Sequence, residues 1–349
     1  MTKVAKISFE ESLGKEVVVA GECMGCAACV AVCPFGCLEY VNEKPEEVEE
    51  CKICGICAQV CPRYELPLPA LEEFVFGRER DPKEEFGVYR RMVVAQSNDK
   101  KVLRFCQDGG VVSSLLASAF QSGMIDAAAI SGIDEDKPFY PVPRLVTNMK
   151  EVLECAGTRY SYSPNLLAFN EGVKQKRTSL AFVGTPCQIQ ALRRIQMFPL
   201  KKHAERVSFA IGLMCTESFT YEGLVEGHIQ KELSINPNDI KKMNIKAKIL
   251  VTTKSGEVKV IPLKEAKQYT RKSCLPCTDF SAELADISAG GLGLGSWTLA
   301  IIRTERGEEL FRKAEEAGML KTKPAEEEER ALDLLTRLSR KKRERQSPR

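Results

Sequence analysis

Hydrophobic and polar residues follow two periods that alternate along the chain from residue 88 onward. Short apolar runs predict strands at 88–96, 126–131, 179–184 and 207–215, and directly after Trp297. Between these runs, apolar residues recur at helical spacing, which predicts helices at 111–123, from Asn148, at 165–175, 185–196 and 219–233, and from Gly307. Alternation of this kind predicts a mixed α/β domain, of fold class α/β or α+β.

Two shorter patterns predict further strands. Near the N-terminus, the apolar run from Val17 to Ala20 predicts a short strand. Between residues 244 and 263, apolar and polar positions alternate on both sides of a Lys-Ser-Gly-Glu sequence at 254–257. Because glycine favours tight turns between strands, this pattern predicts a hairpin.

Composition distinguishes two segments outside these elements. Residues 67–87 are rich first in proline and then in charge, which predicts a linker between domains at 1–66 and 88–325. Residues 326–349 begin with four consecutive glutamates and end in a basic cluster. This charge segregation favours a solvated, frayed C-terminal helix, and the alternative is a docking element for an acidic partner or a lipid surface.

Cysteine spacing carries the strongest chemical signal in the chain. The pattern CxxCxxCxxxCP occurs twice between Cys23 and Cys61. Three cysteines at this spacing hold one face of a [4Fe–4S] cluster, and the fourth, before proline, ligates the other cluster. A structural zinc site is the alternative, but it needs only two CxxC pairs. The crossover rule assigns cluster 1 to Cys23, Cys26, Cys29 and Cys61, and cluster 2 to Cys51, Cys54, Cys57 and Cys33.

Length and composition limit what surrounds this small ferredoxin-like domain. The 349 residues leave room for a second, larger domain. Fifteen cysteines, and a start without an apolar signal region, indicate reduced cytoplasmic thiols that bind metal. No apolar run has the length of a membrane span, and the net charge of +3 is too small to indicate a nucleic-acid partner. With only two histidines, His203 and His228, the chain suits chemistry that cofactors carry.

Four cysteines outside the repeated motif form a second pattern. Cys187 and Cys215 each end a predicted strand, and Cys274 and Cys277 form a CxxC pair. Strand ends at one edge of a sheet converge, so these four residues are candidate ligands of a third [4Fe–4S] cluster. A zinc site and inert buried thiols are the alternatives. The remaining cysteines, Cys37, Cys106 and Cys155, have no such pattern and are expected to be packing residues.

Glycine-rich segments give weaker signals. Gly109 and Gly110 precede a predicted helix and could place backbone N–H groups against a phosphate, or could simply form a turn. The run from Gly290 to Gly295 does not fit GxGxxG and precedes a strand, so it is not a dinucleotide fingerprint. The sequence also contains no GxxxxGK[ST] motif for nucleoside triphosphates.

Five ordered motifs resemble those of one protein family, the β subunits of coenzyme F420 hydrogenases and dehydrogenases. They are CQDGGVVSSLL, AGTRYSYSP, FVGTPCQIQALR, GLMCTESF and RKSCLPCTDFSAELADISAGGLGLGSWT, and they extend over roughly residues 88 to 307. The resemblance implies a domain that binds FAD and one iron–sulfur cluster and exchanges hydride with coenzyme F420. With the repeated cysteine motif in front, the chain resembles the electron-input subunit of archaeal complexes that oxidise reduced coenzyme F420.

The resemblance also suggests which residues contact the cofactors. Arg159, Arg193 or Lys272 would suit the acidic tails of FAD and coenzyme F420, although each arginine could be an ordinary surface charge and Tyr160 a packed core aromatic. The candidate flavin contacts are Gly109, Gly110, Ser113, Thr158, Arg159, Tyr160, Gly184 and Thr185.

The function expected from the resemblance is oxidation of reduced coenzyme F420 by hydride transfer to FAD. Single electrons would then pass through the clusters to a membrane-bound quinone or methanophenazine complex, with the chain in the cytoplasm or attached to the membrane through partner subunits. One alternative is the reverse reaction in a hydrogenase, ferredoxin-linked or disulfide-reductase complex. Another is a non-catalytic electron-transfer subunit, and a different substrate such as a chlorophyll precursor also remains open.

Overall fold

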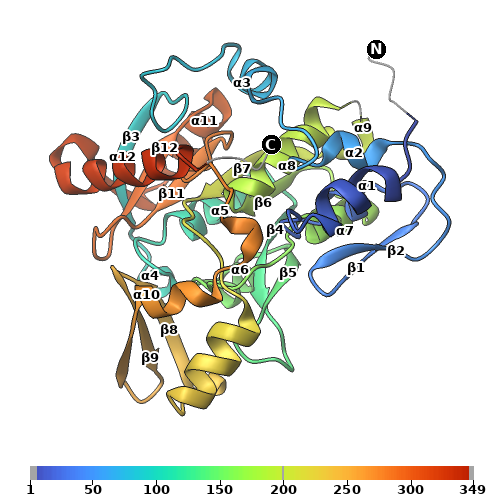
Figure 1. Ribbon diagram of the computed structural model, residues 1–349. Helices are drawn as coiled ribbons and strands as arrows, with labels where there is room; N and C mark the ends of the chain where they lie inside the picture. Colours follow the sequence, from blue (N-terminus) through green and yellow to red (C-terminus); the bar gives the residue numbers. More distant parts are fainter. Residues whose placement is uncertain (1–5, 199, 346–349) are drawn as a thin grey trace.

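The computed structural model describes residues 6–198 and 200–345. Within these residues, the centre is an eight-stranded mixed sheet in the order β13-β3-β12-β11-β7-β6-β4-β5 (Figure 1). Strands β11, β7, β6 and β4 are parallel, and the strands outside them are antiparallel to their neighbours. The strands are β3 (Arg91–Ser97), β4 (Ala127–Ile133), β5 (Pro141–Val146), β6 (Leu180–Gly184), β7 (Val207–Leu213), β11 (Ile287–Gly290), β12 (Thr298–Ile302) and β13 (Leu320–Pro324).

Alternate residues of the parallel strands face two separate hydrophobic cores. On β6, Phe182 belongs to one core and Ala181 to the other. Because both faces are covered, these strands are continuous apolar runs, and this is why the sequence pattern located them. The first core is covered by α7 (Leu166–Lys174) and α8 (Pro186–Met197), and the second by α5 (Val111–Gln121) and α11 (Glu305–Glu316).

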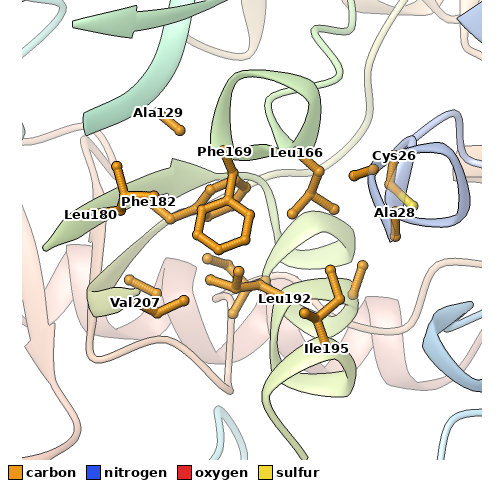
Figure 2. Packing of buried hydrophobic residues seen from close by; sticks show 14 of the residues in the cluster. Cys26, Ala28, Ala129, Leu166, Phe169, Leu180, Phe182, Leu192, Ile195 and Val207 are labelled. Carbon is orange, nitrogen blue, oxygen red and sulfur yellow. The ribbon is translucent and has the colours of Figure 1, made fainter. Parts of the chain in front are cut away.

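The first core continues from the sheet into the N-terminal region. Figure 2 shows Phe169 of α7 beside Phe182 of β6; their ring centroids are 6.3 Å apart and their planes meet at 89°. Leu166, Cys26 and Ala28 belong to the same cluster of buried residues. The N-terminal region therefore shares a hydrophobic core with the large sheet.

This N-terminal region is built from short elements. The predicted strand at Val17 is wrong, because Val17 lies in a π-helix. Leu13 and Val17 are spaced four residues apart on that helix and are only 1% and 2% exposed. A run of so few apolar residues does not distinguish helix from strand. The elements are η1 (Glu10–Val19), α1 (Ala28–Val32), β1 (Leu38–Val41), β2 (Lys44–Glu47) and α2 (Ile56–Val60).

The segment expected to be a linker contains an ordered helix, α3 (Leu68–Phe76). Leu71 is fully buried in the first core. The buried carboxylate of Glu72 pairs with Arg80 at 2.7 Å, and Arg80 also pairs with Glu283 of the large domain at 2.5 Å. Apolar burial and ion pairs thus hold this connection against the large domain.

The expectation of a solvated, frayed C-terminal helix is also wrong for residues 329–343. They form α12 (Glu329–Arg343), in which Leu335 is fully buried and Lys342 is 3% exposed. Charged residues cover its outer face, and Ala331 and Leu335 turn inward at helical spacing. Residues 346–349 of the predicted tail lie outside the described residues.

A second, three-stranded sheet lies beside the large one and consists of β8 (Ile240–Ile245), β9 (Lys248–Thr253) and β10 (Val258–Pro262). The predicted hairpin at 254–257 is confirmed, because it joins β9 to β10. The remaining helices are α4 (Lys100–Phe105), α6 (Met149–Glu154), α9 (Lys201–Ala204), η2 (Glu222–Glu232), η3 (Pro237–Asp239), α10 (Leu263–Ala266), η4 (Lys267–Tyr269), η5 (Lys272–Cys274) and η6 (Ala325–Glu327). Among the described helices, none has the length and apolar character needed to cross a membrane.

Candidate functional site

The cysteines assigned to cluster 1 line a single cavity. Cys23, Cys26, Cys29 and Cys61 share this cavity with Leu13 and Val17 of η1. Cys61, the residue that the crossover rule assigned, lies with the three cysteines of the first motif instead of those of its own motif. Burial raises the pKa of the Cys61 thiol to about 11. The cavity therefore combines four sulfur ligands with an apolar wall.

The cysteines assigned to cluster 2 form a matching group. Burial, together with the nearby thiols of Cys54, Cys51 and Cys33, raises the pKa of the Cys57 thiol to about 12. The backbone N–H of Phe9 donates to the Sγ atom of Cys51 at 3.4 Å. Here too the cysteine before proline, Cys33, joins the opposite motif.

The two motifs share a backbone conformation as well as a sequence. Gly25 and Ile53 occupy equivalent positions and have φ angles of 72° and 53°. At the next equivalent pair, Ala27 and Gly55 start α1 and α2 with φ angles of 62° and 70°. Positive φ is unfavourable for residues other than glycine, so Ile53 and Ala27 keep a strained conformation. The two motifs therefore repeat in backbone conformation as well as in cysteine spacing.

The structure also brings together the four cysteines assigned to the third cluster. Cys187 is the second residue of α8, and Cys215 lies two residues after the end of β7. Burial raises the pKa of the Cys215 thiol, and the nearby thiols of Cys274, Cys187 and Cys277 act in the same direction. The backbone N–H of Ser218 donates to the Sγ atom of Cys274 at 3.4 Å. As predicted from the strand ends, these thiols converge at one edge of the sheet.

Helix α12 covers this third thiol group with positive charge. The Nζ atom of Lys342 donates to the Sγ atom of Cys277 at 3.1 Å and to the carbonyl of Asp279 at 3.2 Å. Arg345, two residues after the end of α12, donates to the carbonyl of Cys274 at 3.0 Å. Sequence reasoning missed both residues. The available signal was the helical spacing of Ala331 and Leu335 inside the charged segment.

Two side chains connect the third group to the first. The hydroxyl of Tyr162 lies 3.5 Å from the Sγ atom of Cys187, and the guanidinium of Arg271 stacks 4.4 Å above the Tyr162 ring. Arg271 also donates to the carbonyl of Met24 at 2.9 Å and pairs with Glu43 at 3.0 Å. Burial raises the pKa of Tyr162, and the neighbouring thiols of Cys187 and of Cys26 in the first group add to the shift.

The three groups differ from a site for a single metal ion. Among residues 6–198 and 200–345, no three His, Cys, Asp or Glu side chains lie close enough together to hold one ion. Zinc needs its sulfur ligands at about 2.3 Å from one centre. A cubane cluster is wider, so its ligands stand further apart. All described cysteines are free of disulfides.

The candidate flavin residues at the start of α5 have close structural neighbours. The backbone N–H of Gly109 donates to Thr298 Oγ1 at 2.9 Å, and a Cβ atom at Gly109 would lie 2.5 Å from the carbonyl of Ala95. Gly110 caps α5 with a φ of 72°, and Ser113 is 9% exposed. Packing and turn geometry thus require both glycines, as the turn interpretation stated.

Residues 158–160 lie between this turn and the third thiol group. The guanidinium of Arg159 donates to the carbonyls of Cys155, Ala156 and Gly157 at 2.6, 3.1 and 3.1 Å, so it stabilises its own loop. Thr158 is half-buried beside it. The hydroxyl of Tyr160 accepts from the backbone N–H of Ile245 at 3.1 Å and lies 3.4 Å from Gln107.

Lys242 is a further contact at this turn, and no sequence motif indicates it. Its Nζ atom donates to the carbonyls of Gln107 and Cys106 at 2.6 and 3.2 Å. Because Lys242 lies on β8, it fixes the small sheet against the turn at Gly109. Tyr160 makes the same connection through Ile245. The turn is thus enclosed by a sheet that the glycine motif alone did not predict.

Other candidates have different surroundings. Thr185 caps α8 through a capping box with Gln188, and its Oγ1 atom lies 3.3 Å from the Sγ atom of Cys187. Gly184 precedes it, and Lys272 is exposed near Cys274. Arg193 is buried and pairs with Asp286 at 2.9 Å. Its predicted role at a cofactor tail is therefore wrong, because its charge is neutralised inside the protein.

The three unpatterned cysteines are placed as packing residues would be. Cys37 is buried and its thiol donates to the carbonyl of Glu50 at 3.4 Å. Cys106 is also buried and donates to the carbonyl of Asp108 at 3.1 Å. Cys155 is half-buried and packs against the second core.

Two family models together match most of the large domain. The N-terminal model of the coenzyme F420 hydrogenase/dehydrogenase beta subunit matches residues 92–170, and the C-terminal model matches residues 177–328. This chain belongs to that family. Neither model covers the repeated cysteine motif before residue 92 or helix α12.

Individual relatives agree with the family. The coenzyme F420 hydrogenase subunit beta of Methanococcus voltae is 37% identical over 262 residues, which are 74% of this chain and 93% of that protein. A protein of the F(420)H(2) dehydrogenase of Methanosarcina mazei is 32% identical over 304 residues, or 85% of this chain and 83% of that protein.

A solved structure has a similar fold. A chain of the F420-reducing [NiFe] hydrogenase complex from Methanosarcina barkeri superposes with a TM-score of 0.72 at 35% identity. The superposition covers 76% of this chain and 92% of that one. The names of both relatives and of this structure refer to coenzyme F420.

Proposed function

We propose that this chain oxidises reduced coenzyme F420 by hydride transfer to FAD and passes the electrons singly to a membrane-bound quinone or methanophenazine complex. The observation that carries the proposal is the spatial sequence of three thiol groups, in which Tyr162 and Arg271 connect the third group to the first. The chain would work in the cytoplasm or at the membrane surface through partner subunits.

The sulfur atoms have the donor chemistry that iron–sulfur clusters need. Four cysteines line the first cavity, and each of the other groups also has four. We assign cluster 1 to Cys23, Cys26, Cys29 and Cys61, cluster 2 to Cys51, Cys54, Cys57 and Cys33, and cluster 3 to Cys187, Cys215, Cys274 and Cys277. When bound, FAD supplies the conversion between a hydride and single electrons, and the clusters supply one-electron carriers.

The protein's own residues would exclude water from these carriers and hold their ligands. Helix η1 covers the first group with Leu13 and Val17. The capping box at Thr185 fixes the start of α8 and hence the position of Cys187. Lys342 donates a hydrogen bond to a ligand sulfur from a buried position. Hydrogen bonds of this kind set the orientation and electron affinity of metal ligands.

The flavin is assigned to the region between the α5 turn and the third group. The N-terminus of α5 offers backbone N–H groups at Gly110 to a phosphate, with Ser113 on the first turn of the helix. Thr158 and Tyr160 lie between that turn and Tyr162, next to Cys187. Gly184 and Thr185 remain proposed flavin contacts next to Cys187. Arg159 would contribute to the flavin site indirectly, by stabilising the loop at residues 155–159.

Anaerobic reconstitution with iron, sulfide and FAD tests this proposal. The full chain should retain iron equivalent to three [4Fe–4S] clusters and one FAD, and it should reduce a one-electron dye with reduced coenzyme F420. Iron for two clusters or fewer, or a flavin-replete sample without dye reduction, would contradict it.

A second candidate function has specific support. The hydrogenase β subunit of Methanococcus voltae is 37% identical to this chain, which favours a chain that reduces coenzyme F420 with electrons from a partner. The two directions differ in the partner. Co-purification from the native cell with a nickel-containing subunit would favour the hydrogenase, and co-purification with membrane subunits would favour the dehydrogenase.

A further inference from the structure

The two cysteine motifs are equivalent in sequence and backbone, and helices α1 and α2 both contribute to the first core, but the loop residues beside the two clusters have different neighbours. A Cβ atom at Gly25, in the first motif, would lie 3.0 Å from the Nη2 atom of Arg271. Arg63, which follows the crossover cysteine Cys61, donates to the carbonyl of Ser273 at 3.0 Å. Both residues beside cluster 1 therefore contact the large domain.

The equivalent residues beside cluster 2 face outward. Ile53 occupies the position of Gly25, and Phe35 occupies the position of Arg63, two residues after the crossover cysteine Cys33. Ile53 and Phe35 are 50% and 54% exposed. Val48 is 47% exposed and its backbone N–H donates to the carbonyl of Cys37 at 3.0 Å, which holds it near the same thiols. The hairpin β1–β2 meets the large domain at its turn, where Glu43 pairs with Arg271, and Val48 lies at the opposite end of the hairpin.

Exposure of these three apolar side chains is energetically unfavourable for the isolated protein. Large apolar side chains on a surface lose the free energy that burial would provide, so a group of them indicates a contact. Ile53 also holds a φ of 53°, a conformation in which Asn or Gly would be less strained. Strain that persists at an exposed apolar residue indicates a role for that side chain.

The charge around these residues defines the partner. Four exposed glutamates lie at the end of β2 and between β2 and the second motif, and the exposed lysines nearby are Lys44 and Lys52. Lys52 is already paired with Glu50 at 3.2 Å. The local charge is thus negative although the whole chain carries +3. A protein with a basic rim around an apolar centre complements it. The glutamates are Glu46, Glu47, Glu49 and Glu50.

We infer that Phe35, Val48 and Ile53 form a docking surface for a redox protein that has a basic rim and carries a one-electron acceptor, such as an iron–sulfur or haem protein. This exit surface, as we call these three residues, deepens the proposed function and rests on its cluster assignments. Cluster 1 faces the large domain and receives the electron, and cluster 2 releases it. In each transfer the reduced cluster 2 loses one electron, the partner's acceptor gains it, and no bond or proton changes place.

The test uses the full-length, cluster-loaded protein and cytochrome c as the probe, because cytochrome c is basic and accepts one electron. Calorimetric titration at low ionic strength measures its affinity. Separately, dithionite-reduced and desalted protein gives the rate constant for cytochrome c reduction, beside that for a small neutral dye. Because dithionite reduces the clusters directly, the result does not depend on coenzyme F420 or FAD. The docking inference and the proposed coenzyme F420 activity can therefore fail independently of each other.

Two independent sets of variants probe the apolar and the charged parts. Phe35→Ser and Ile53→Asn remove apolar contacts, and asparagine tolerates the positive φ. Glu46→Lys with Glu49→Lys reverses charge and spares Glu47, whose carboxylate accepts from the backbone N–H of Cys51 at 3.2 Å. The matched controls are Phe74→Ser, at a phenylalanine that is 49% exposed on α3, and Glu326→Lys with Glu327→Lys at exposed sites.

Each set should lower both the affinity for cytochrome c and its reduction rate by about tenfold or more. Iron content, cluster spectra and the rate of dye reduction should stay unchanged, and the controls should match the wild type. The inference is overturned if both sets bind and reduce cytochrome c as the wild type does. It is also overturned if the wild type is a dimer in sedimentation that Ile53→Asn dissociates, because a second copy would then occupy the surface.

Discussion

The two thiol groups of the N-terminal region and the thiol group of the large domain each contain four cysteines, but the chain brings these cysteines together in different ways. The first two are encoded locally, since one short backbone pattern with a left-handed residue before each helix is used twice. The third is assembled from the start of α8, the end of β7 and the loop around Cys274. A local motif can be recognised from the spacing of its cysteines in the sequence. A site assembled from distant segments can be predicted only after the sheet that brings those segments together has been predicted.

The two regions also differ in what covers them. The second thiol group has apolar residues open to solvent beside it, and the third group lies under α12, where a lysine donates to one of its sulfur atoms. A terminal electron carrier needs access to a partner, and an internal one needs insulation from water and other oxidants. The difference in exposure therefore follows the order proposed for the clusters.

The largest effect should come from breaking the assembled site. Cys215→Ser should remove the iron of one cluster and abolish electron delivery from reduced coenzyme F420 to clusters 1 and 2, whose own iron should remain. Cys61→Ser should instead disturb the N-terminal clusters and leave flavin reduction largely intact. Iron analysis and electron paramagnetic resonance after adding reduced coenzyme F420 measure both. Loss of flavin reduction in Cys61→Ser would show that the two regions are not separable.

The next effect concerns the contact between the regions. Arg271 is 7% exposed and contacts Met24 and Glu43. Arg271→Met should cost roughly 1–2 kcal/mol of local stability, because it removes a hydrogen bond to the carbonyl of Met24 and leaves the half-buried carboxylate of Glu43 unpaired. Amide hydrogen exchange of residues 22–29 should become faster. Arg63→Met removes one hydrogen bond from a half-buried arginine and should have a smaller effect. Equal exchange in both variants would argue against Arg271 as the main connection.

A smaller effect should appear in the reduction potential of cluster 3. Lys342→Met removes a positive charge and a hydrogen bond from the Sγ atom of Cys277. Because the charge favours the reduced cluster, the potential should become more negative by about 60 mV, which corresponds to about 1.4 kcal/mol. Redox titration monitored by electron paramagnetic resonance measures it. Lys341→Met, at an exposed lysine one position earlier, should leave the potential unchanged. An equal shift in both would point to a general charge effect.

The smallest effect should depend on pH. His203 on α9 is buried near Asn170, and burial lowers its pKa. Its folded pKa thus lies below the unfolded value of about 6.5, so the unfolded chain binds more protons as the pH falls through that value. Stability should fall by less than about 1 kcal/mol as the pH drops from about 7.5 to about 5.5. In thermal unfolding, the stability of His203→Gln should not show this decrease between about pH 7.5 and about pH 5.5. A variant with the same pH dependence of stability as the wild type would refute the prediction.

Sequence reasoning reached the parts of the fold that local patterns specify. The parallel strands were found because burial on both faces makes them continuous apolar runs, and Cys187 and Cys215 were paired because both follow such strands. Arg193 was misplaced because its partner Asp286 is distant in sequence and nothing local indicates an internal ion pair. Helix α12 was misread because its charge hid the inward face, and Lys242 carried no motif at all.

The position of α12 in the chain would affect how the protein acquires the iron of the proposed third cluster. All four cysteines of the third group precede α12, so during synthesis they leave the ribosome before Lys342 and Arg345 exist. A cluster can therefore be delivered to an open site, and docking of the helix then closes it. In the finished protein, the rate at which a chelator strips this iron should follow the rate at which α12 detaches. Helix α12 would thus slow the loss of iron from the site that it covers.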